Sequence, residues 1–258
     1  MAVELEYLYA RIESKYHIKL HTESCFDKTI AWTHVVEEIE FIASLHGEEL
    51  IFYSGVSCTS PAWLKRYIME LNKHHAGGLV MSFRDGETFP QEIVEYCNKI
   101  RFPIFSASWT TPYIDVMRLF AEILLQNEQR ETNLIAALKN AIYYPENEGS
   151  YLSHFERNGF YRDMDYAVII LSCHAYDGDA GNERLRKIER SMHFMLGNVV
   201  MYEEKGRLTV LAVGCPLSVI QARFRKICGK DCNVYAGIGT MAAGIKEIHL
   251  SYEKAYTA

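Results

Sequence analysis

The chain lacks any apolar stretch of about 18 residues, the length that a membrane-spanning helix requires. Its acidic start, Met-Ala-Val-Glu-Leu-Glu-Tyr, also lacks the basic segment and apolar core of a secretory signal. Positive charge is not in excess, since the formal net charge is −6, which argues against a broad nucleic-acid-binding surface. These absences favour a cytoplasmic protein that makes no membrane contact and folds into one large or two ordinary domains.

Cysteine and histidine patterns that would hold a disulfide framework or a metal are missing as well. The seven cysteines are scattered through largely apolar surroundings, which is typical of reduced thiols. Cys228 and Cys232 have the closest spacing, and we interpret them as plain thiols because no second pair lies nearby to complete a zinc site. We therefore expect neither a metal nor a cofactor.

Motifs of catalysis and nucleotide binding are also absent. The sequence contains no Gly-x-Ser-x-Gly elbow, no Walker loop and no Gly-x-Gly-x-x-Gly fingerprint, and Gly237-Ile-Gly239 is too short to count as one. No serine or cysteine has a recognisable catalytic setting. We therefore expect no catalytic residues and no enzyme.

The chain does contain a strand-and-helix rhythm that is repeated three times. Apolar runs that end in small polar clusters occupy residues 49–55, 78–84 and 103–109, and helical spacing occupies 61–75 and 90–100. This alternation predicts a parallel α/β sheet. Because ligands bind beyond the carboxyl ends of such strands, the three polar ends should meet in one crevice.

Weaker patterns flank this region. Residues 1–16 have a helical pattern typical of a loosely attached start, 17–23 and 29–35 resemble strands, and 36–45 a short acidic helix. After it, residues 113–144 form one long helix with a polar middle. This is either a surface helix kinked near Asn127 or, as we favour, a signalling helix that pairs with its twin in a dimer.

The part of the chain after residue 144 predicts a different fold. A turn cluster at 145–149 is followed by a strand at 166–173 and a helix at 182–197. Next comes a hairpin of two strands, 198–203 and 207–214. A helix at 217–228, a strand at 233–238 and a helix at 244–256 complete the pattern. This order is the ferredoxin-like plan with an extra helix. We expect an α/β domain over residues 1–125, a helical linker over 126–150 and an α+β domain over 151–258.

Both halves contain motifs of a known family. Residues 17–125 contain Ile30-Ala-Trp-Thr-His-Val-Val-Glu37, Gly47-Glu-Glu-Leu50, Ser54-Gly55, Ala76-Gly-Gly-Leu-Val80, Phe89-Pro90, Phe102-Pro-Ile104 and Tyr113-Ile114. Through these motifs they resemble the N-terminal sensory domain of the PucR-type purine catabolism regulators of bacteria. Residues 150–258 resemble the degenerate GGDEF-like domain that follows, through Val234-Tyr-Ala-Gly-Ile-Gly239, Gly244-Ile245 and Leu250-Ser-Tyr-Glu-Lys-Ala255.

The sequence departs from this family pattern at three places. The first is Gly47-Glu48, where a doubled glycine is expected before Glu-Leu. Met201-Tyr202 stands where active diguanylate cyclases have paired glycines, so a nucleotide phosphate could not approach the backbone, although Glu203-Glu204 remains. The sequence ends at residue 258, before the helix-turn-helix domain that such regulators carry at their end. We expect the sensory and dimerisation part of a longer regulator, which contacts DNA only through that domain. The alternative is a naturally short version.

The resemblance implies that the ligand is a purine or a purine breakdown product. A flat ring of this kind needs an aromatic face and a few fixed donors and acceptors. The candidate ligand-binding residues are Trp32, Glu37, Glu49, Tyr53, Ser54, Gly55, Phe83, Arg84, Ser108 and Trp109. Alternate strand residues face opposite sides, so about half of them should be buried against helices. An ion pair of Arg84 with Asp85 or Glu87 is the other interpretation of that side chain.

These observations predict the ligand-sensing part of a homodimeric transcription regulator. Two other hypotheses remain open at this point. The first is a nucleotide-handling enzyme of the diguanylate cyclase type. The second is a dimerisation module without a ligand.

Overall fold

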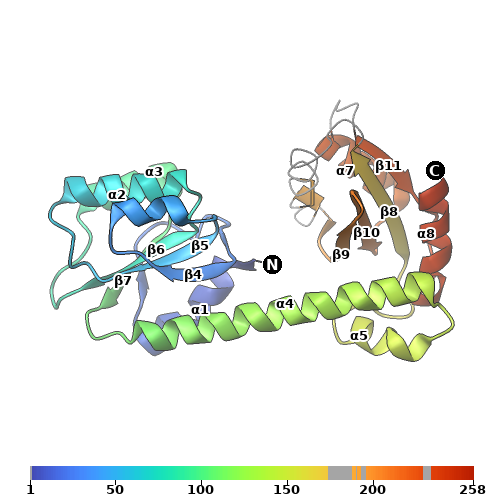
Figure 1. Ribbon diagram of the computed structural model, residues 1–258, viewed down its shortest axis with the longest axis horizontal. Helices are drawn as coiled ribbons and strands as arrows, with labels where there is room; N and C mark the ends of the chain where they lie inside the picture. Colours follow the sequence, from blue (N-terminus) through green and yellow to red (C-terminus); the bar gives the residue numbers. More distant parts are fainter. Residues whose placement is uncertain (1, 174–187, 190, 193–195, 229–233) are drawn as a thin grey trace. The chain divides into compact units, whose positions relative to one another are not determined.

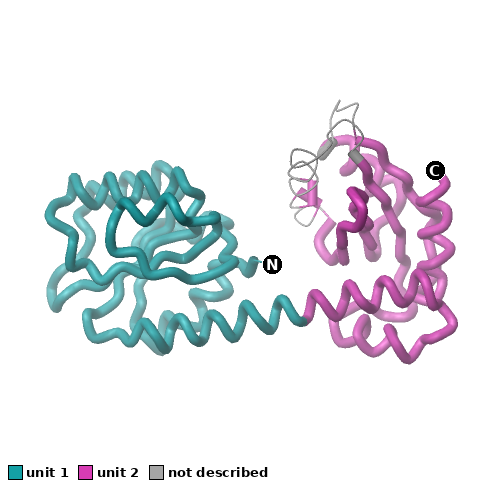
Figure 2. The backbone as a smooth tube through the Cα atoms, viewed as in Figure 1, with its two compact units in different colours: residues 1–129 teal, residues 130–258 magenta. Residues whose placement is uncertain are grey.

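The computed structural model describes residues 2–173, 188–189, 191–192, 196–228 and 234–258 (Figure 1). The chain divides into two compact units, residues 1–129 (unit 1) and 130–258 (unit 2) (Figure 2). Within the described residues, no helix has both the length and the apolar character needed to cross a bilayer. Each unit has its own sheet and its own buried cores.

Unit 1 is built on a sheet of five strands. Their order is β2 (Lys19–Leu20), β7 (Ile104–Ser108), β6 (Gly78–Phe83), β5 (Glu49–Tyr53) and β4 (Trp32–Val35). Strands β4 to β7 run parallel and only β2 is antiparallel. A separate antiparallel pair joins β1 (Val3–Glu4) to β3 (Thr29–Ile30). The predicted parallel α/β sheet is confirmed.

Helices cover both faces of this sheet (Figure 1). Helices α2 (Pro61–Lys73) and α3 (Gln91–Ile100) pack on one face, and α1 (Leu5–Tyr16) and the first part of α4 (Tyr113–Tyr143) pack on the other. The strands alternate accordingly: Tyr53 is buried in the α2–α3 core, whereas its neighbour Phe52 is buried in the α1–α4 core.

Two expectations for the first fifty residues are wrong. Residues 1–16 are not loosely attached, because α1 buries Leu5, Leu8 and Ile12 in the core. The short acidic helix is reduced to a 3-10 turn, η1 (Ile39–Ser44). The reason is that the backbone N–H of Val36 donates a hydrogen bond to the carbonyl of Phe52 in β5. The chain is therefore extended at the residue where the helix was expected to begin.

Unit 2 contains a four-stranded antiparallel sheet. The strand order is β11 (Val234–Ile238), β8 (Tyr166–Cys173), β10 (Arg207–Val213) and β9 (Val199–Glu204). All neighbouring strands are antiparallel. Counted along the chain this is the order 4-1-3-2 of a ferredoxin-like sheet, which confirms the α+β prediction for this half.

The two faces of this sheet have separate cores. On one face lie the last part of α4, the short helix α5 (Leu152–Glu156) and α8 (Ile248–Thr257), and on the other lies α7 (Leu217–Cys228). Two 3-10 turns, η2 (Glu148–Ser150) and η3 (Ile245–Glu247), precede α5 and α8. The helix expected over 182–197 falls largely outside the described residues.

Candidate functional site

The parallel strands of unit 1 end at one edge of the sheet, which we call the carboxyl edge. Strand register places Tyr53 beside Met81 and Phe83 beside Ser108, so the residues that follow β5, β6 and β7 adjoin. The backbone N–H of Trp109 donates to the carbonyl of Phe83 at 2.8 Å, which extends this alignment beyond the strands. This is the edge at which open parallel sheets bind ligands.

Glu37 and Ser54 connect the ends of β4 and β5. The Glu37 carboxylate accepts hydrogen bonds from the backbone N–H of Ser54 at 3.1 Å and from its hydroxyl at 2.8 Å. Gly55 follows with φ +84°, and a Cβ there would lie 2.8 Å from the carbonyl oxygen of Ser82. Only glycine therefore allows β5 and β6 to approach so closely at this point.

Tyr113 connects the carboxyl edge to the start of α4, and its role was not predicted. The Ser82 hydroxyl donates to Tyr113 Oη at 2.7 Å, and Tyr113 Oη donates to the carbonyl of Tyr53 at 3.2 Å. Burial raises the pKa of Tyr113 far above its ordinary value, so the phenol remains a donor. Its signals in the sequence are its position at the start of the long helix and its place in Tyr113-Ile114, one of the motifs that carry the family resemblance.

Arg84 and Trp109 form the exposed part of the carboxyl edge. The guanidinium carbon of Arg84 lies 5.4 Å from the centre of the Trp109 ring, which is a cation–π distance. Trp109 is 46% exposed. The Glu87 carboxylate accepts from the backbone N–H of Arg84, and the guanidinium forms no ion pair with any described residue. The pair therefore offers an aromatic face and unpaired donors to solvent.

Two of the candidate aromatic residues lie on the α2–α3 face. Tyr53 is fully buried, with its ring 5.7 Å from that of Trp63 and 5.0 Å from that of Tyr67. Phe83 is half-buried and packs edge-on against Phe89 at 4.8 Å. Both side chains belong to the core, as expected for half of the candidates.

Glu49 lies at the amino end of β5, away from the carboxyl edge. Its buried carboxylate accepts from the backbone N–H groups of His46 at 2.7 Å and Gly47 at 2.8 Å. This geometry closes the turn before β5. Glu49 is therefore outside the site that we propose.

Ser108 and Trp32 are exposed but lie in different surroundings. The Ser108 hydroxyl lies at the carboxyl edge, 3.0 Å from the hydroxyl of Thr110. Trp32 lies on the edge strand β4 and lines a groove of about 500 Å³ between β4 and α4. This β4–α4 groove is lined by Trp32, Thr33, Val35, Tyr113, Ile114, Met117, Arg118 and Ala121.

Comparison with protein families matches both units, in the order expected from the residues. Residues 16–124 match the purine catabolism regulatory protein-like family, named PucR, and residues 145–258 match the GGDEF-like domain. The chain therefore contains a PucR-like domain followed by a GGDEF-like domain. Both resemblances drawn from the sequence are thereby confirmed, and the carboxyl edge lies within the PucR-like match.

Other comparisons add little to this assignment. No curated protein matches the chain. Among solved structures, it is similar to the regulator of polyketide synthase expression from Bifidobacterium adolescentis, with 16% identity and a TM-score of 0.32. That match covers 46% of this chain and about half (48%) of the other.

The hairpin of the GGDEF-like domain differs from that of an active cyclase. Met201 and Tyr202 are both buried in β9, one in the core of each sheet face. The turn is formed by Lys205 and Gly206, with φ +53° and +72°. The described residues contain no cluster of histidine, cysteine, aspartate or glutamate suited to a metal ion. We propose no nucleotide chemistry at this hairpin, because its bulky side chains occupy the space that a phosphate would need.

Proposed function

We propose that this PucR-like chain is the ligand-sensing and dimerisation part of a bacterial transcription regulator, in which unit 1 binds a purine or a purine breakdown product at the carboxyl edge. The observation that carries this proposal is the exposed pair of Arg84 and Trp109 at the ends of parallel strands. The match of residues 16–124 to the purine catabolism regulatory protein-like family supports the choice of ligand.

The chemistry of this edge suits a purine. The purine ring would stack on the exposed side chain of Trp109. Arg84 has no carboxylate partner among the described residues and can donate two parallel hydrogen bonds to a ring carbonyl and its neighbouring nitrogen, or to a urate-like anion. The hydroxyl of Ser108 and the carboxylate of Glu37 supply further polar contacts.

Tyr113 provides a route from this edge to α4. Its hydroxyl contacts both β5 and β6, and its backbone begins the helix that continues to Tyr143. A ligand transmits a signal only if it binds one arrangement of these elements more tightly than another. We propose that movement of the strand ends is passed to α4 through the hydrogen bonds of Tyr113.

The proposal is tested by thermal unfolding with guanine, xanthine, hypoxanthine, urate and adenine. One of them is expected to raise the unfolding midpoint of unit 1 by about 5 °C or more at one hundred times its Kd. All three tryptophans, at positions 32, 63 and 109, lie in unit 1, so their emission follows this unit alone.

The variants W109A and R84Q should lose this shift while unit 1 stays folded. R66Q is the matched control, because Arg66 is also exposed but lies on α2. If no purine or ureide shifts the midpoint at millimolar concentration, the proposed ligand class is wrong.

We also propose that the β4–α4 groove forms the homodimer contact. Ile114 is 70% exposed, and Trp32 and Val35 are about half exposed beside it. Apolar side chains gathered in this way are typical of an interaction surface. The groove also lies along β4, the last strand of its sheet.

Sedimentation velocity tests this contact. I114R is expected to convert the dimer to a monomer, since a charge would be buried without a partner. M69R places the same charge on α2 at a side chain that is 48% exposed, and should leave the dimer intact. A dimer that survives I114R would assign the contact to another surface.

A further inference from the structure

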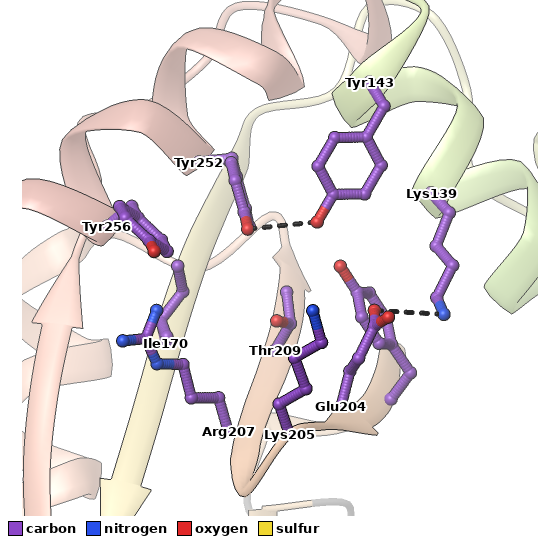
Figure 3. A pocket seen from close by; sticks show the side chains of 10 residues that line it. Lys139, Tyr143, Ile170, Glu204, Lys205, Arg207, Thr209, Tyr252 and Tyr256 are labelled. Atoms are coloured by element: carbon purple, nitrogen blue, oxygen red, sulfur yellow. Dashed lines mark hydrogen bonds and ion pairs between the residues drawn. The ribbon is translucent and has the colours of Figure 1, made fainter.

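Unit 2 contains a cleft that the sequence did not predict and that lies outside the proposed purine site. It has a volume of about 470 Å³ and lies on the sheet face covered by α4 and α8 (Figure 3). Side chains of β8, β9 and β10 form its floor, and side chains of α4 and α8 form its walls. This volume lies in the range of small-molecule sites.

Positive charge is concentrated in this cleft. Lys139, Lys205 and Arg207 line it together with the single carboxylate of Glu204, so its lining carries a net charge of +2 in a chain whose net charge is −6. Lys139 Nζ pairs with Glu204 at 3.2 Å. Lys205 and Arg207 form no ion pair with any described residue. The cleft therefore has one neutralised and two free cations, which favours an anion.

Aromatic rings form much of the remaining lining. Tyr143 and Tyr252 meet across the cleft with their hydroxyl oxygens 3.1 Å apart, as Figure 3 shows. The Arg207 guanidinium lies 4.8 Å from the centre of the Tyr256 ring. Flat faces next to a guanidinium are suited to a planar ring that carries negative charge.

Tyr202 supplies an independent indication of a ligand. Its side chain lines the cleft and is only 6% exposed, and its buried hydroxyl has no partner in good hydrogen-bond geometry, although the hydroxyls of Thr209 and Tyr143 lie beside it. Burial, with the tyrosines beside it, raises its pKa far above the ordinary value, so the hydroxyl keeps its proton. Buried hydroxyls in native proteins nearly always have a partner, and an acceptor oxygen from a ligand would supply one.

We propose that this cleft binds a small aromatic anion, a single planar ring that carries one carboxylate or phosphate group. The anionic group pairs with Arg207 and Lys205, the ring packs against the tyrosines, and a ligand oxygen accepts from Tyr202 Oη. A net charge of +2 is balanced by one phosphate group or half balanced by one carboxylate, whereas a nucleoside triphosphate would exceed it. This site is independent of the purine site in unit 1.

Equilibrium dialysis of the whole chain tests the ligand class. The probes are 4-hydroxybenzoate and phenyl phosphate, with benzyl alcohol as a ring without charge and inorganic phosphate as a charge without a ring. At least one aromatic anion is expected to bind ten-fold or more tightly than either control, and the better one identifies the anionic group. Equal binding of inorganic phosphate, or no binding of either aromatic anion, overturns the proposal.

Variants then assign the binding to this cleft. R207Q should weaken binding at least ten-fold, whereas R225Q, on α7 at the opposite face of the sheet, should not change it. Y202F removes only the unpaired hydroxyl and should weaken binding about five-fold without loss of folded protein. Wild-type affinity in R207Q would overturn the assignment.

The proposal for the purine site and the proposal for this cleft can be disproved separately. Unit 2 has no tryptophan, so an aromatic anion bound in this cleft leaves tryptophan emission unchanged. A purine stacked on Trp109 changes that emission. An aromatic anion that quenches tryptophan in wild type but not in W109A would instead place its binding at the carboxyl edge and overturn the proposal for the cleft.

Discussion

Replacement of Gly237 by alanine is expected to destabilise unit 2 by roughly 3 kcal/mol. A Cβ at this position would lie 1.8 Å from the carbonyl oxygen of Ala255 and 2.9 Å from its carbonyl carbon. Both atoms belong to the backbone of α8, which cannot rotate away as a side chain does. Helix α8 would have to move from β11, and the buried contacts of Ile248 and Ala255 would loosen with it.

The matched control is G149A. Gly149 lies in the same unit, has an ordinary φ, and an added Cβ there would meet no atom within 4 Å. Its substitution is expected to be neutral or to stabilise by about 0.5 kcal/mol through the unfolded chain. Urea unfolding followed by circular dichroism measures both variants. A G237A protein as stable as G149A would show that α8 does not lie against β11.

The same glycine illustrates what the sequence could and could not predict. The phrase that contains Gly237 and Gly239 carried the resemblance to the GGDEF-like domain, and the shortness of Gly237-Ile-Gly239 argued against a nucleotide-binding fingerprint. Its structural role was invisible, because it depends on a helix that follows later in the chain. At Gly239, too, a Cβ would lie 2.0 Å from the carbonyl oxygen of Ser251 in α8. Both glycines allow close packing between a strand and a helix.

Elements set by local periodicity were predicted well. The strand at Tyr166–Cys173 and the helix at Leu217–Cys228 begin and end where the apolar pattern does. Elements whose structure depends on contacts with distant parts of the chain were not predicted correctly. The segment around Glu37 has a helical composition, but the Val36 N–H donates to the carbonyl of Phe52 in β5, and the Glu37 carboxylate accepts from Ser54, which follows that strand. Tertiary hydrogen bonds override local propensity here.

The candidate sites show the same division. Alternation along strands predicted that some candidates would be buried, and Tyr53 is. The alternation along the strands could not predict that Arg84 would lie over Trp109 rather than pair with a neighbouring carboxylate. The cleft in unit 2 had no sequence signal at all, because Tyr143 and Tyr252 are 109 residues apart and meet only in the folded unit.

In unit 1 the largest expected loss comes from F105A, at about 4 kcal/mol. Phe105 is 1% exposed, lies in β7 at the core shared by α1 and α4, and its ring packs 5.1 Å from that of Tyr9. Removing the ring leaves a cavity between the sheet and α1, because the strand on which Phe105 lies is held by β6 and cannot collapse into it.

Tryptophan emission during urea unfolding measures this loss, and F41A is the control. Phe41 is 64% exposed on η1, so its truncation should change stability by no more than about 0.5 kcal/mol. F105A should leave the unfolding of unit 2 unchanged, since the buried cores of that unit contain no residue before Leu134. A loss in F105A as small as that in F41A would mean that α1 does not cover the sheet, and residues 1–16 would then be the loosely attached start that their sequence pattern suggests.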